Sequence, residues 1–425
     1  MEIYVVKQGD SLYSIGQRYG LSVSQLTAFN LLTSNDLVVG QTICIPSYKT
    51  VHTVRAGDTL LSIAEEYTTT LNQLWRNNQI LGGKSNIYEG QTLVIEYNDM
   101  PMLLFVSNGY TYPYIDRDLL RATLPYLTYM TVFTYGFTED AELIVPDDDE
   151  VVKTALEYGT APIMLLSTLG ENGMFSNRLS NILLQSEDKQ NKLIDNIIAV
   201  MREKGYRGLD IDFEYIYPSD RASYVNFVSL ARERLNALGY FVVVALAPKT
   251  SDDQIGLLYE GHDYSALGEA ADYVLIMTYE WGYTYGPPLP VAPIDKVEEV
   301  VKYAVSRIPP QKIFMGLPNY GYVWKLPFVK GESKADSLSN VGAVALAREV
   351  GAEIMFDNDA KTPYFTFYRD GIENICYFED ARSIEAKLDL IRRYSLMGGS
   401  WWNIMRFFPQ NWVVLNSEFD IDSNN

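Results

Sequence analysis

The stretch Arg207-Gly208-Leu209-Asp210-Ile211-Asp212-Phe213-Glu214 alternates apolar and carboxyl side chains. Successive side chains of a β-strand point to opposite faces, so one face here would carry Asp210, Asp212 and Glu214 and the other three apolar groups. Like charges in a row on an exposed strand repel one another and destabilise a sheet. A strand with its apolar face under helices and its acidic face in a cleft accounts for both the apolar and the carboxyl side chains. We therefore predict a barrel strand that ends in an active site.

From about Met100 onward, strand-like apolar runs alternate with helical segments. Eight such runs with crossover helices predict an α/β fold, a (β/α)8 TIM barrel. The stretch 322–378 is too long for one loop and has its own β pattern, so we expect a small inserted α+β subdomain there. The expected barrel strands are Met102–Val106, Tyr129–Tyr135, Pro162–Leu166, Gly208–Glu214, Phe241–Ala247, Tyr273–Thr278, Lys312–Leu317 and Gly399–Ile404.

The N-terminal part of the chain contains a repeat. Tyr4–Ile15 recurs as His52–Ile63, and Gly40–Thr42 recurs as Gly90–Thr92. Each unit is expected to form a strand, two helices and a strand, because its Gly-Asp-Ser or Gly-Asp-Thr turn leads into an amphipathic helix. The expected units are residues 1–48, 49–98 and, for the barrel, 99–425.

Composition limits the partners of the chain. The formal net charge of −20 repels nucleic acid and anionic membranes, so we expect neither as a partner. No segment approaches the roughly 20 apolar residues of a membrane span. The N-terminus has no basic region followed by an apolar stretch, so we expect no secretory signal. We further expect a monomer.

Cysteine and histidine are scarce. Cys44 and Cys376 are far apart in the sequence and belong to no CxxC pattern, so a disulfide framework is not expected. With His52 and His262 as the two histidines, a multi-His metal site is excluded and a Ser-His-Asp apparatus is disfavoured. We expect no metal and no cofactor, and chemistry that depends on carboxylates.

The repeated units resemble the LysM module, a family that binds N-acetylglucosamine-containing glycans such as peptidoglycan and chitin. The resemblance implies that these units bind such glycans. In that family the groove lies between the loop after the first strand and the loop before the last, here Gly9–Leu12 with Leu31–Val38 and Gly57–Leu60 with Ile80–Ile87. We expect most of the repeated Gly, Asp and Asn residues to build the fold.

The acidic stretch resembles the D-x-x-D-x-D-x-E signature of glycoside hydrolase family 18. Asp210, Asp212 and Glu214 match its last three acidic positions, whereas Arg207 stands at the first, which puts support of the strand in doubt more than the chemistry. The resemblance implies that Glu214 is the general acid and that the 2-acetamido oxygen of the substrate attacks the anomeric carbon, with retention of configuration. Asp212 would orient that acetamide, and Asp210 would share a proton with Asp212.

Two further segments carry the same resemblance. Met277–Trp281 resembles an M-x-Y-D element with Glu280 in place of Asp, and Tyr279 would hydrogen-bond the acetamido carbonyl. Trp402, in Gly398–Trp402, matches the tryptophan that forms the floor under the sugar at subsite −1, although core packing is the alternative. The other expected substrate-binding residues are Trp281, Tyr285 and Tyr320, while Tyr283, Tyr322 and Trp324 would either line the cleft or pack in the core.

Three segments, Glu280–Pro288, Phe378–Ser383 and Phe408–Trp412, resemble the spore-cortex glucosaminidases of spore-forming bacteria, which also carry two LysM modules. This resemblance implies hydrolysis of N-acetylglucosaminyl β-1,4 bonds in cortex peptidoglycan fragments, and a location in the spore. Glu379 and Asp380 are expected only to begin a helix.

Four alternatives stay open. One is a chitinase with the same chemistry, and another is a catalytically inactive glycan-binding lectin of the same fold, against which the presence of Glu214 argues. A third is a protein that only anchors spore layers, which would leave the acidic strand unexplained. The last is an acidic cluster that binds a cation.

Overall fold

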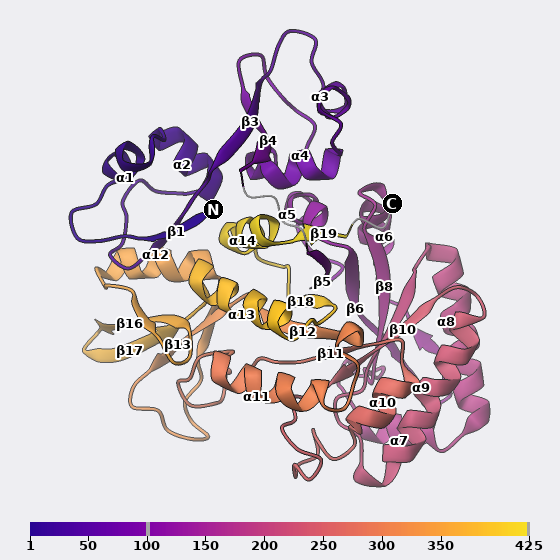
Figure 1. Cartoon of the computed structure of the whole chain (residues 1–425). Helices are drawn as coiled ribbons and strands as arrows, with labels where there is room; N and C mark the ends of the chain where they lie inside the picture. The colour runs from indigo at the N-terminus through magenta and orange to yellow at the C-terminus, as the bar shows by residue number, and fades with distance from the viewer. Residues whose placement is uncertain (99–102, 423–425) are drawn as a thin grey trace.

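The structure, a computed structural model, describes residues 1–98 and 103–422. Eight parallel strands at its centre close into a barrel, because β5 pairs with β6 on one side and with β18 on the other (Figure 1). Short strands β7 (Leu143–Ile144) and β19 (Asp420–Ile421) extend this sheet. The barrel strands, in order, are β5 (Leu104–Thr111), β6 (Tyr129–Phe137), β8 (Ala161–Ser167), β9 (Gly208–Asp212), β10 (Phe241–Leu246), β11 (Tyr273–Ile276), β12 (Ile313–Pro318) and β18 (Gly398–Trp402).

The predicted TIM barrel is confirmed, and each of the eight expected strands overlaps a strand of the barrel. Met102, the expected first residue of the first strand, lies outside the described residues. β9 ends at Asp212, so Glu214 lies just beyond the strand and not within it as expected. The reason is that the backbone carbonyl of Phe213 bonds to a side chain, that of His262, instead of to a neighbouring strand.

Helices surround the barrel, and Figure 1 shows α7 to α10 along one side of it. The helices are α5 (Arg117–Thr123), α6 (Asp149–Glu157), α7 (Asn177–Leu184), α8 (Glu187–Lys204), α9 (Arg221–Asn236), α10 (Tyr264–Ala270), α11 (Ile294–Val305), α13 (Ala381–Arg393) and α14 (Pro409–Glu418). Short 3-10 helices are Leu124–Tyr126, Pro218–Asp220 and Pro310–Lys312.

The alternation in β9 sorts its side chains as the sequence predicts. Leu209, Ile211 and Phe213 are buried in the main core between the strands and the helices. Phe213 stacks on Tyr224 and Phe227 of α9, with ring centroids 5.7 and 5.8 Å away. The opposite face points into the barrel, which places the acidic groups inside it.

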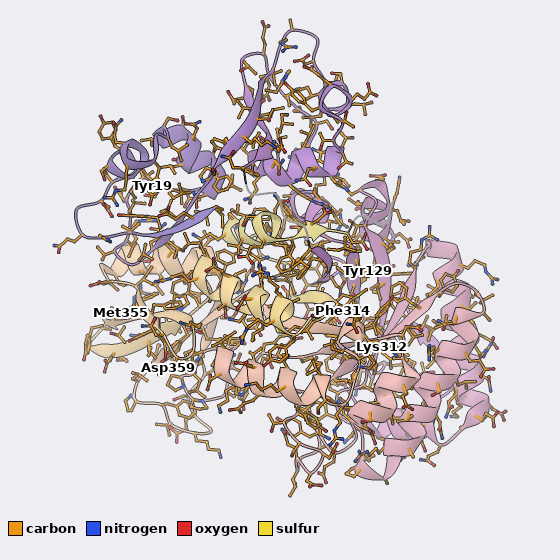
Figure 2. The ribbon with its side chains drawn as sticks, in the orientation of Figure 1. Tyr19, Tyr129, Lys312, Phe314, Met355 and Asp359 are labelled. Carbon is orange, nitrogen blue, oxygen red and sulfur yellow. The ribbon has the colours of Figure 1, made fainter. Side chains whose placement is uncertain are left out.

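A ring of four aromatic side chains closes the N-terminal end of the barrel. Tyr129 contacts Phe241 at 5.1 Å between centroids, Phe241 contacts Tyr273 at 5.7 Å, and Tyr273 contacts Phe314 at 5.9 Å. Phe314 returns to Tyr129 at 6.4 Å; both are labelled in Figure 2. The barrel is therefore a packed core at this end, and its polar side chains gather at the other.

Each N-terminal unit forms the expected strand, two helices and strand. The first consists of β1 (Glu2–Val5), α1 (Leu12–Tyr19), α2 (Val23–Asn30) and β2 (Thr42–Ile45). The second consists of β3 (Tyr48–Thr53), α3 (Leu60–Tyr67), α4 (Leu71–Asn77), a 3-10 helix (Gln79–Leu81) and β4 (Thr92–Tyr97). Within each unit the two strands pair antiparallel.

The repeated polar residues build these units. Asn30 donates to the carbonyls of Leu26 and Cys44 and accepts the N–H of Cys44, and Asn78 makes the same three contacts in the second unit. Asp10 and Asp58 each accept a backbone N–H from three residues earlier, which closes the turn before the helix. These contacts confirm the expected structural role of the repeated Asp and Asn positions.

The inserted subdomain follows β12. It contains β13 (Gly321–Lys325), β14 (Asp336–Leu338), α12 (Asn340–Val350), β15 (Met355–Asp357), β16 (Thr362–Arg369) and β17 (Ile372–Tyr377). The five strands form an antiparallel sheet in the order β14-β13-β17-β16-β15. This arrangement confirms the predicted α+β insertion.

Both N-terminal units are docked on the rest of the chain (Figure 1). In the first, the carbonyl of Val39 accepts the N–H of Ile354 at 2.9 Å, so the unit contacts the insertion. In the second, buried Arg76 donates from Nε to the carbonyl of Pro125 at 2.5 Å, and Tyr158 of the barrel donates to the carbonyl of Gly83 at 2.7 Å. Backbone carbonyls accept these three hydrogen bonds, two of them on the N-terminal units and one on the barrel.

The start of α13 differs in one respect from the expectation. Asp380 is the helix N-cap, as expected, and accepts the N–H groups of Arg382 and Ser383. Glu379, in contrast, is buried and bonds to the buried ammonium of Lys387 at 2.8 Å. Glu379 therefore forms a buried ion pair in addition to preceding the start of the helix. Among the described residues, no helix has both the length and the apolar composition needed to cross a lipid bilayer.

Candidate active site

The end of β9 brings the three predicted acids to the C-terminal mouth of the barrel. Asp210 is 1% exposed and Asp212 is 9% exposed, while Glu214 is half-buried. Asp210 Oδ2 accepts a hydrogen bond of 2.5 Å from the hydroxyl of Tyr110, which lies on β5. The other oxygen of Asp210 and Oδ1 of Asp212 have no hydrogen-bond partner among the described residues. A buried acceptor without a donor is costly, so Asp212 is suited to a donor from a ligand.

Burial shifts the acids toward their neutral forms. Loss of solvent raises the pKa of Asp210 to about 7, and the hydrogen bond from Tyr110 opposes this shift. The pKa of Asp212 is raised well above its usual value, first by burial and then by the charges of Glu214 and Asp210. The pKa of Glu214 is raised by burial and then by the charge of Glu280. At neutral pH the site can therefore hold protons on carboxyl groups, which a general acid requires.

Tyr279 and Glu280 follow β11 and complete the acidic cluster. Burial, followed by the charge of Asp212, raises the pKa of Tyr279 well above its usual value, so its hydroxyl keeps its proton and can donate it in a hydrogen bond. Glu280 has a left-handed backbone with φ of 70°, and its exposed side chain lines the mouth of the barrel. Surrounding protein atoms raise the pKa of Glu280, and the hydroxyl of Tyr320 partly offsets this.

A cavity of about 320 Å³ lies at the C-terminal ends of the barrel strands. Of the predicted binding residues, Glu280, Tyr320 and Trp402 line it, as does Tyr322. Trp402 is half-buried, and its ring packs against Phe133 at 5.1 Å between centroids. The remaining lining residues are Tyr112, Tyr114, Asn319, Ser337, Asn403, Met405 and Arg406.

Four predicted cleft residues lie elsewhere. Tyr285 is 63% exposed, with the ammonium of Lys334 6.0 Å from its ring centroid, and it does not line the cavity. Tyr283 is 42% exposed and is also outside the lining. Trp281 packs against the main core, and Trp324 is buried, donating from Nε1 to the carbonyl of Gly286. Binding roles for Trp281 and Tyr285 stay predictions.

Arg207, which stands at the first signature position, is exposed, and its backbone N–H donates to the carbonyl of Pro162. β9 still pairs with β8 and β10 on its two sides, so this departure leaves the strand supported. Within residues 1–98 and 103–422, no three His, Cys, Asp or Glu side chains are grouped so as to hold a metal ion.

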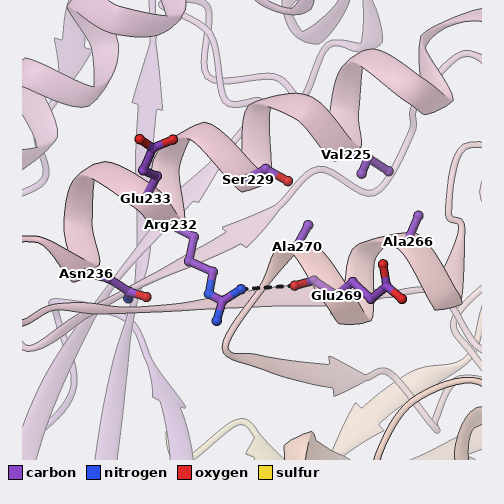
Figure 3. Close-up of a pocket in the computed structure, with 8 residues that line it drawn as sticks. All are labelled: Val225, Ser229, Arg232, Glu233, Asn236, Ala266, Glu269 and Ala270. Atoms are coloured by element: carbon purple, nitrogen blue, oxygen red, sulfur yellow. Dashed lines mark hydrogen bonds between the residues drawn. The ribbon is translucent and has the colours of Figure 1, made fainter.

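A second hollow lies on the outside of the barrel, between α9 and α10 (Figure 3). Arg232 crosses it and donates to the carbonyl of Glu269 at 3.1 Å. Its lining holds none of the predicted acids or aromatic floor residues. The cavity at the mouth of the barrel is therefore the better candidate for the active site.

Several residues of the site were not predicted from the sequence. Tyr110 could have been found, because β5 alternates as β9 does and places Asn108 and Tyr110 on the inner face. Tyr112, Tyr114 and Arg406 follow β5 and β18 in loops, where periodicity carries no signal. Such loop residues reach the cavity only through the closure of the barrel.

Comparison with known proteins agrees with this geometry. The family model of glycosyl hydrolases family 18 matches residues 105–406, and that of the LysM domain matches residues 4–46 and 52–96. The cortical fragment-lytic enzyme of Bacillus subtilis (strain 168) is 39% identical over 429 residues, which cover 99% of each chain. The crystal structure of the spore cortex-lytic enzyme SleL of Bacillus cereus superimposes with a TM-score of 0.84 at 36% identity and covers 100% of this chain and 99% of its own.

The crystal structure of a chitinase from Chromobacterium violaceum ATCC 12472 matches a smaller share of the chain. It has a TM-score of 0.68 at 25% identity and covers 74% of this chain and 98% of its own. The acidic strand end, the cavity beside it and the two family matches lead to one conclusion. The chain is a glycoside hydrolase that belongs to glycosyl hydrolases family 18 and carries two LysM domains at its N-terminal end.

Proposed function

We propose that this protein hydrolyses N-acetylglucosaminyl β-1,4 bonds in peptidoglycan, namely in fragments of the spore cortex. The observation that carries the proposal is the set of acids at the end of β9, of which Asp210 and Asp212 are buried. None of the three acids lines the cavity, but Tyr110, which donates to Asp210, packs against Trp402 in the cavity lining. Full-length similarity to cortical fragment-lytic enzymes supports the substrate class and a role in the spore. The LysM domains would hold the same glycan.

Glu214 would act as the general acid and protonate the leaving glycosidic oxygen. Its raised pKa, caused first by burial, keeps a proton available for this step. The 2-acetamido oxygen of the substrate would attack the anomeric carbon, and ionised Glu214 would then activate water. The anomeric configuration is retained because two inversions occur in sequence.

Asp212 and Tyr279 would hold the acetamide between them. Oδ1 of Asp212 has no partner among the described residues and can accept the acetamido N–H. Tyr279 keeps its proton and would donate to the acetamido oxygen. Asp210, bonded to Tyr110, lies deeper and would share a proton with Asp212 as charge develops.

Trp402 would form the floor under the sugar at subsite −1. An aromatic face packs on the apolar face of a pyranose, while nearby polar groups fix its orientation. Tyr320 and Glu280, which line the same cavity, would contact the sugar hydroxyls.

The substitution Glu214→Gln tests the proposal. We expect kcat on cortex fragments to fall on the order of 10²–10⁴-fold, because the general acid is lost, while glycan binding stays nearly unchanged. Release of reducing ends and pull-down with insoluble cortex measure the two properties. NMR of the first product formed by the wild-type enzyme should show the β-anomer.

The control for this test is Glu233→Gln, an exposed residue on the far hollow of α9 that should leave kcat unchanged. Undiminished turnover in Glu214→Gln would refute the assigned acid. An inverted product would refute participation by the acetamide. If wild-type enzyme cleaved chitin oligomers and left cortex fragments intact, chitinase activity would replace the proposed function.

A further inference from the structure

A small cavity lies where the two LysM domains and the barrel meet. Helix α14 of the barrel contacts both domains at this point (Figure 1). Its Gln410 donates to the carbonyl of Thr42 in the first domain at 2.7 Å. Its Asn416 donates to Asn77 Oδ1 in the second domain at 3.0 Å. The cavity has a volume of about 20 Å³, which is enough for one water-sized particle.

All three parts of the chain supply walls of this cavity. The residues that matter here are Phe29 and Pro46 of the first domain, Arg76 and Tyr97 of the second, and Val413 and Ser417 of α14. None of these residues lines the cavity at the mouth of the barrel, so the two sites are separate. Because its walls come from three parts, the small cavity is complete when both domains are docked.

The guanidinium of Arg76 is buried in this lining, and the residue is 6% exposed. Its Nε donates to the carbonyl of Pro125 at 2.5 Å, and its Nη1 donates to the carbonyl of Ile421 at 3.2 Å. Its Nη2 is also buried, and it has no hydrogen-bond partner among residues 1–98 and 103–422. A buried donor on a charged group is costly to leave unpaired, so Nη2 is suited to an acceptor from a ligand.

The charge of Arg76 needs a partner as well. Its two acceptors are neutral carbonyls, which do not neutralise a cation. Burial lowers the pKa of Arg76 to about 10, and the charges of Asp420 and Asp422, which form no ion pair with it, oppose this shift. Arg76 therefore stays charged at neutral pH, and a buried charge is unfavourable unless an opposite charge accompanies it.

Charge and size together define the ligand. The positive charge and the unpaired donor favour an anion, whereas a water molecule would satisfy the donor and leave the charge in place. The volume of about 20 Å³ is too small for a polyatomic anion such as phosphate or the carboxylate group of a peptide. A halide ion meets both requirements.

We infer that a chloride ion binds to Arg76 between the two LysM domains and α14, and that it stabilises the docking of both domains on the barrel. The ion accepts the N–H of Nη2. It binds the docked chain in preference to the undocked chain, because undocking removes the walls of the cavity, so chloride shifts the equilibrium toward docking by mass action. The site takes no part in hydrolysis, and the inference does not depend on the proposed function.

Crystallography with bromide tests the site itself. Bromide replaces chloride and scatters anomalously, so crystals of the full chain grown in sodium bromide should show an anomalous peak at hydrogen-bond distance from Arg76 Nη2. An ordered water at that position, without an anomalous peak, would overturn the inference. This experiment uses the unaltered sequence at the site, so it does not depend on the folding of any variant.

The thiol of Cys44 reports on docking in solution. Cys44 belongs to the first domain and is buried, and Cys376→Ser removes the other cysteine. Chloride replaces gluconate, which is too large for the cavity, at constant ionic strength. We expect the labelling rate of Cys44 to fall about 5-fold between zero and about 0.2 M chloride, which is the fall for a Kd of about 50 mM when labelling requires undocking.

Three variants locate the effect of chloride. Arg76→Met removes the cation, so the labelling rate should no longer depend on chloride. Ser417→Leu keeps the cation but fills the cavity, so it should also abolish the dependence. Arg55→Met is the matched control: Arg55 is exposed in the same domain and lies outside the cavity lining, so the response to chloride should be retained.

Two results in solution would overturn the inference. Equal labelling of the unaltered site in chloride and in gluconate would mean that a bromide peak marks an adventitious ion only. A response to chloride that persists in both Arg76→Met and Ser417→Leu would place the ion elsewhere on the chain. A response that is lost in these two variants and kept in Arg55→Met supports the site at Arg76.

Discussion

At the scale of single residues, the surroundings of Glu214 raise its pKa and so keep it protonated. Burial is the first cause of its raised pKa, and the negative charge of Glu280 is the second. Glu280 stands where the family motif has aspartate, and its left-handed backbone directs it to the mouth of the cavity. This substitution therefore keeps the charge that acts on Glu214 while it lengthens the side chain.

Glu280→Gln should move the alkaline limb of the kcat–pH profile to lower pH. Without the neighbouring negative charge, ionised Glu214 is less disfavoured, so its pKa falls and the acid loses its proton at lower pH. Measurement of kcat at saturating substrate from pH 4 to 9 tests this. Glu280→Asp keeps the charge and should leave the limb in place; an unshifted limb in Glu280→Gln would contradict the coupling.

At the scale of elements, His262 joins the ends of two barrel strands. Its Nε2 lies 3.1 Å from the carbonyl of Phe213, just after β9, and its Nδ1 accepts the N–H of Ala247, just after β10, at 3.0 Å. The ring thus replaces ladder hydrogen bonds where the strands separate. Because Phe213 directly precedes Glu214, this bridge also positions the general acid.

His262→Ala should lower the free energy of unfolding by about 2–4 kcal/mol at pH 7.5, since it leaves two buried backbone groups unpaired and creates a cavity. It should also lower kcat, because the support of Glu214 is lost. Urea unfolding and kcat on a short fragment measure the two effects. His52→Ala is the control, because His52 also bonds through both ring nitrogens but lies in the second LysM domain, so kcat should be unchanged.

The lowered pKa of His262 also predicts that its contribution to the free energy of unfolding falls as pH falls. Burial lowers the pKa of His262 to about 4, whereas in the unfolded chain it is about 6.5. Between these values the unfolded chain binds more protons, so the contribution of His262 is complete above about pH 6.5 and is lost as pH falls toward 4. The stability gap between wild type and His262→Ala should therefore narrow over that range, and a constant gap would contradict it.

At the scale of the whole molecule, Gly40 lies at the contact between the first LysM domain and the insertion. Gly40 has φ of +84°, and a Cβ there would lie 1.8 Å from the carbonyl oxygen of Ile354 in the insertion. Gly20, in the same domain, has φ of +69° and open space around it. At both positions the positive φ would strain a residue with a side chain, but of the two only Gly40 meets the insertion.

Gly40→Ala should undock the first LysM domain, and Gly20→Ala should not. Undocking would expose the thiol of Cys44, which is buried in the main core, to a thiol reagent; Cys376→Ser removes the other cysteine from the assay. We expect the labelling rate of Cys44 to rise at least about 10-fold in Gly40→Ala. Equal labelling of the two glycine variants would show that the contact with Ile354 does not hold the domain. The expected unit boundaries after residues 48 and 98 stay predictions.

Much of the site could be predicted from the local sequence pattern, because several of its residues lie on strands. Asp210, Asp212 and Trp402 lie on strands, where alternation and register fix the face that each side chain occupies. Tyr285 and Trp281 lie in a long loop. The resemblance predicted that they bind substrate, but a loop has no periodicity from which the orientation of their side chains could be predicted. Arg406 and Tyr112 come from loops far apart in the sequence, so their meeting in one cavity depends on closure of the barrel.

Local sequence patterns were enough to predict the barrel, the two repeated domains and the acids at the end of β9, because each of these depends on short-range alternation or turn chemistry. The resemblance of the motifs indicated the family. Long-range packing sets the bond between Tyr110 and Asp210, the bridge made by His262, the place of Arg406 in the cavity and the docking of both LysM domains. Those contacts join residues tens to hundreds of positions apart, and packing of the closed barrel fixes them through distances that no local pattern records.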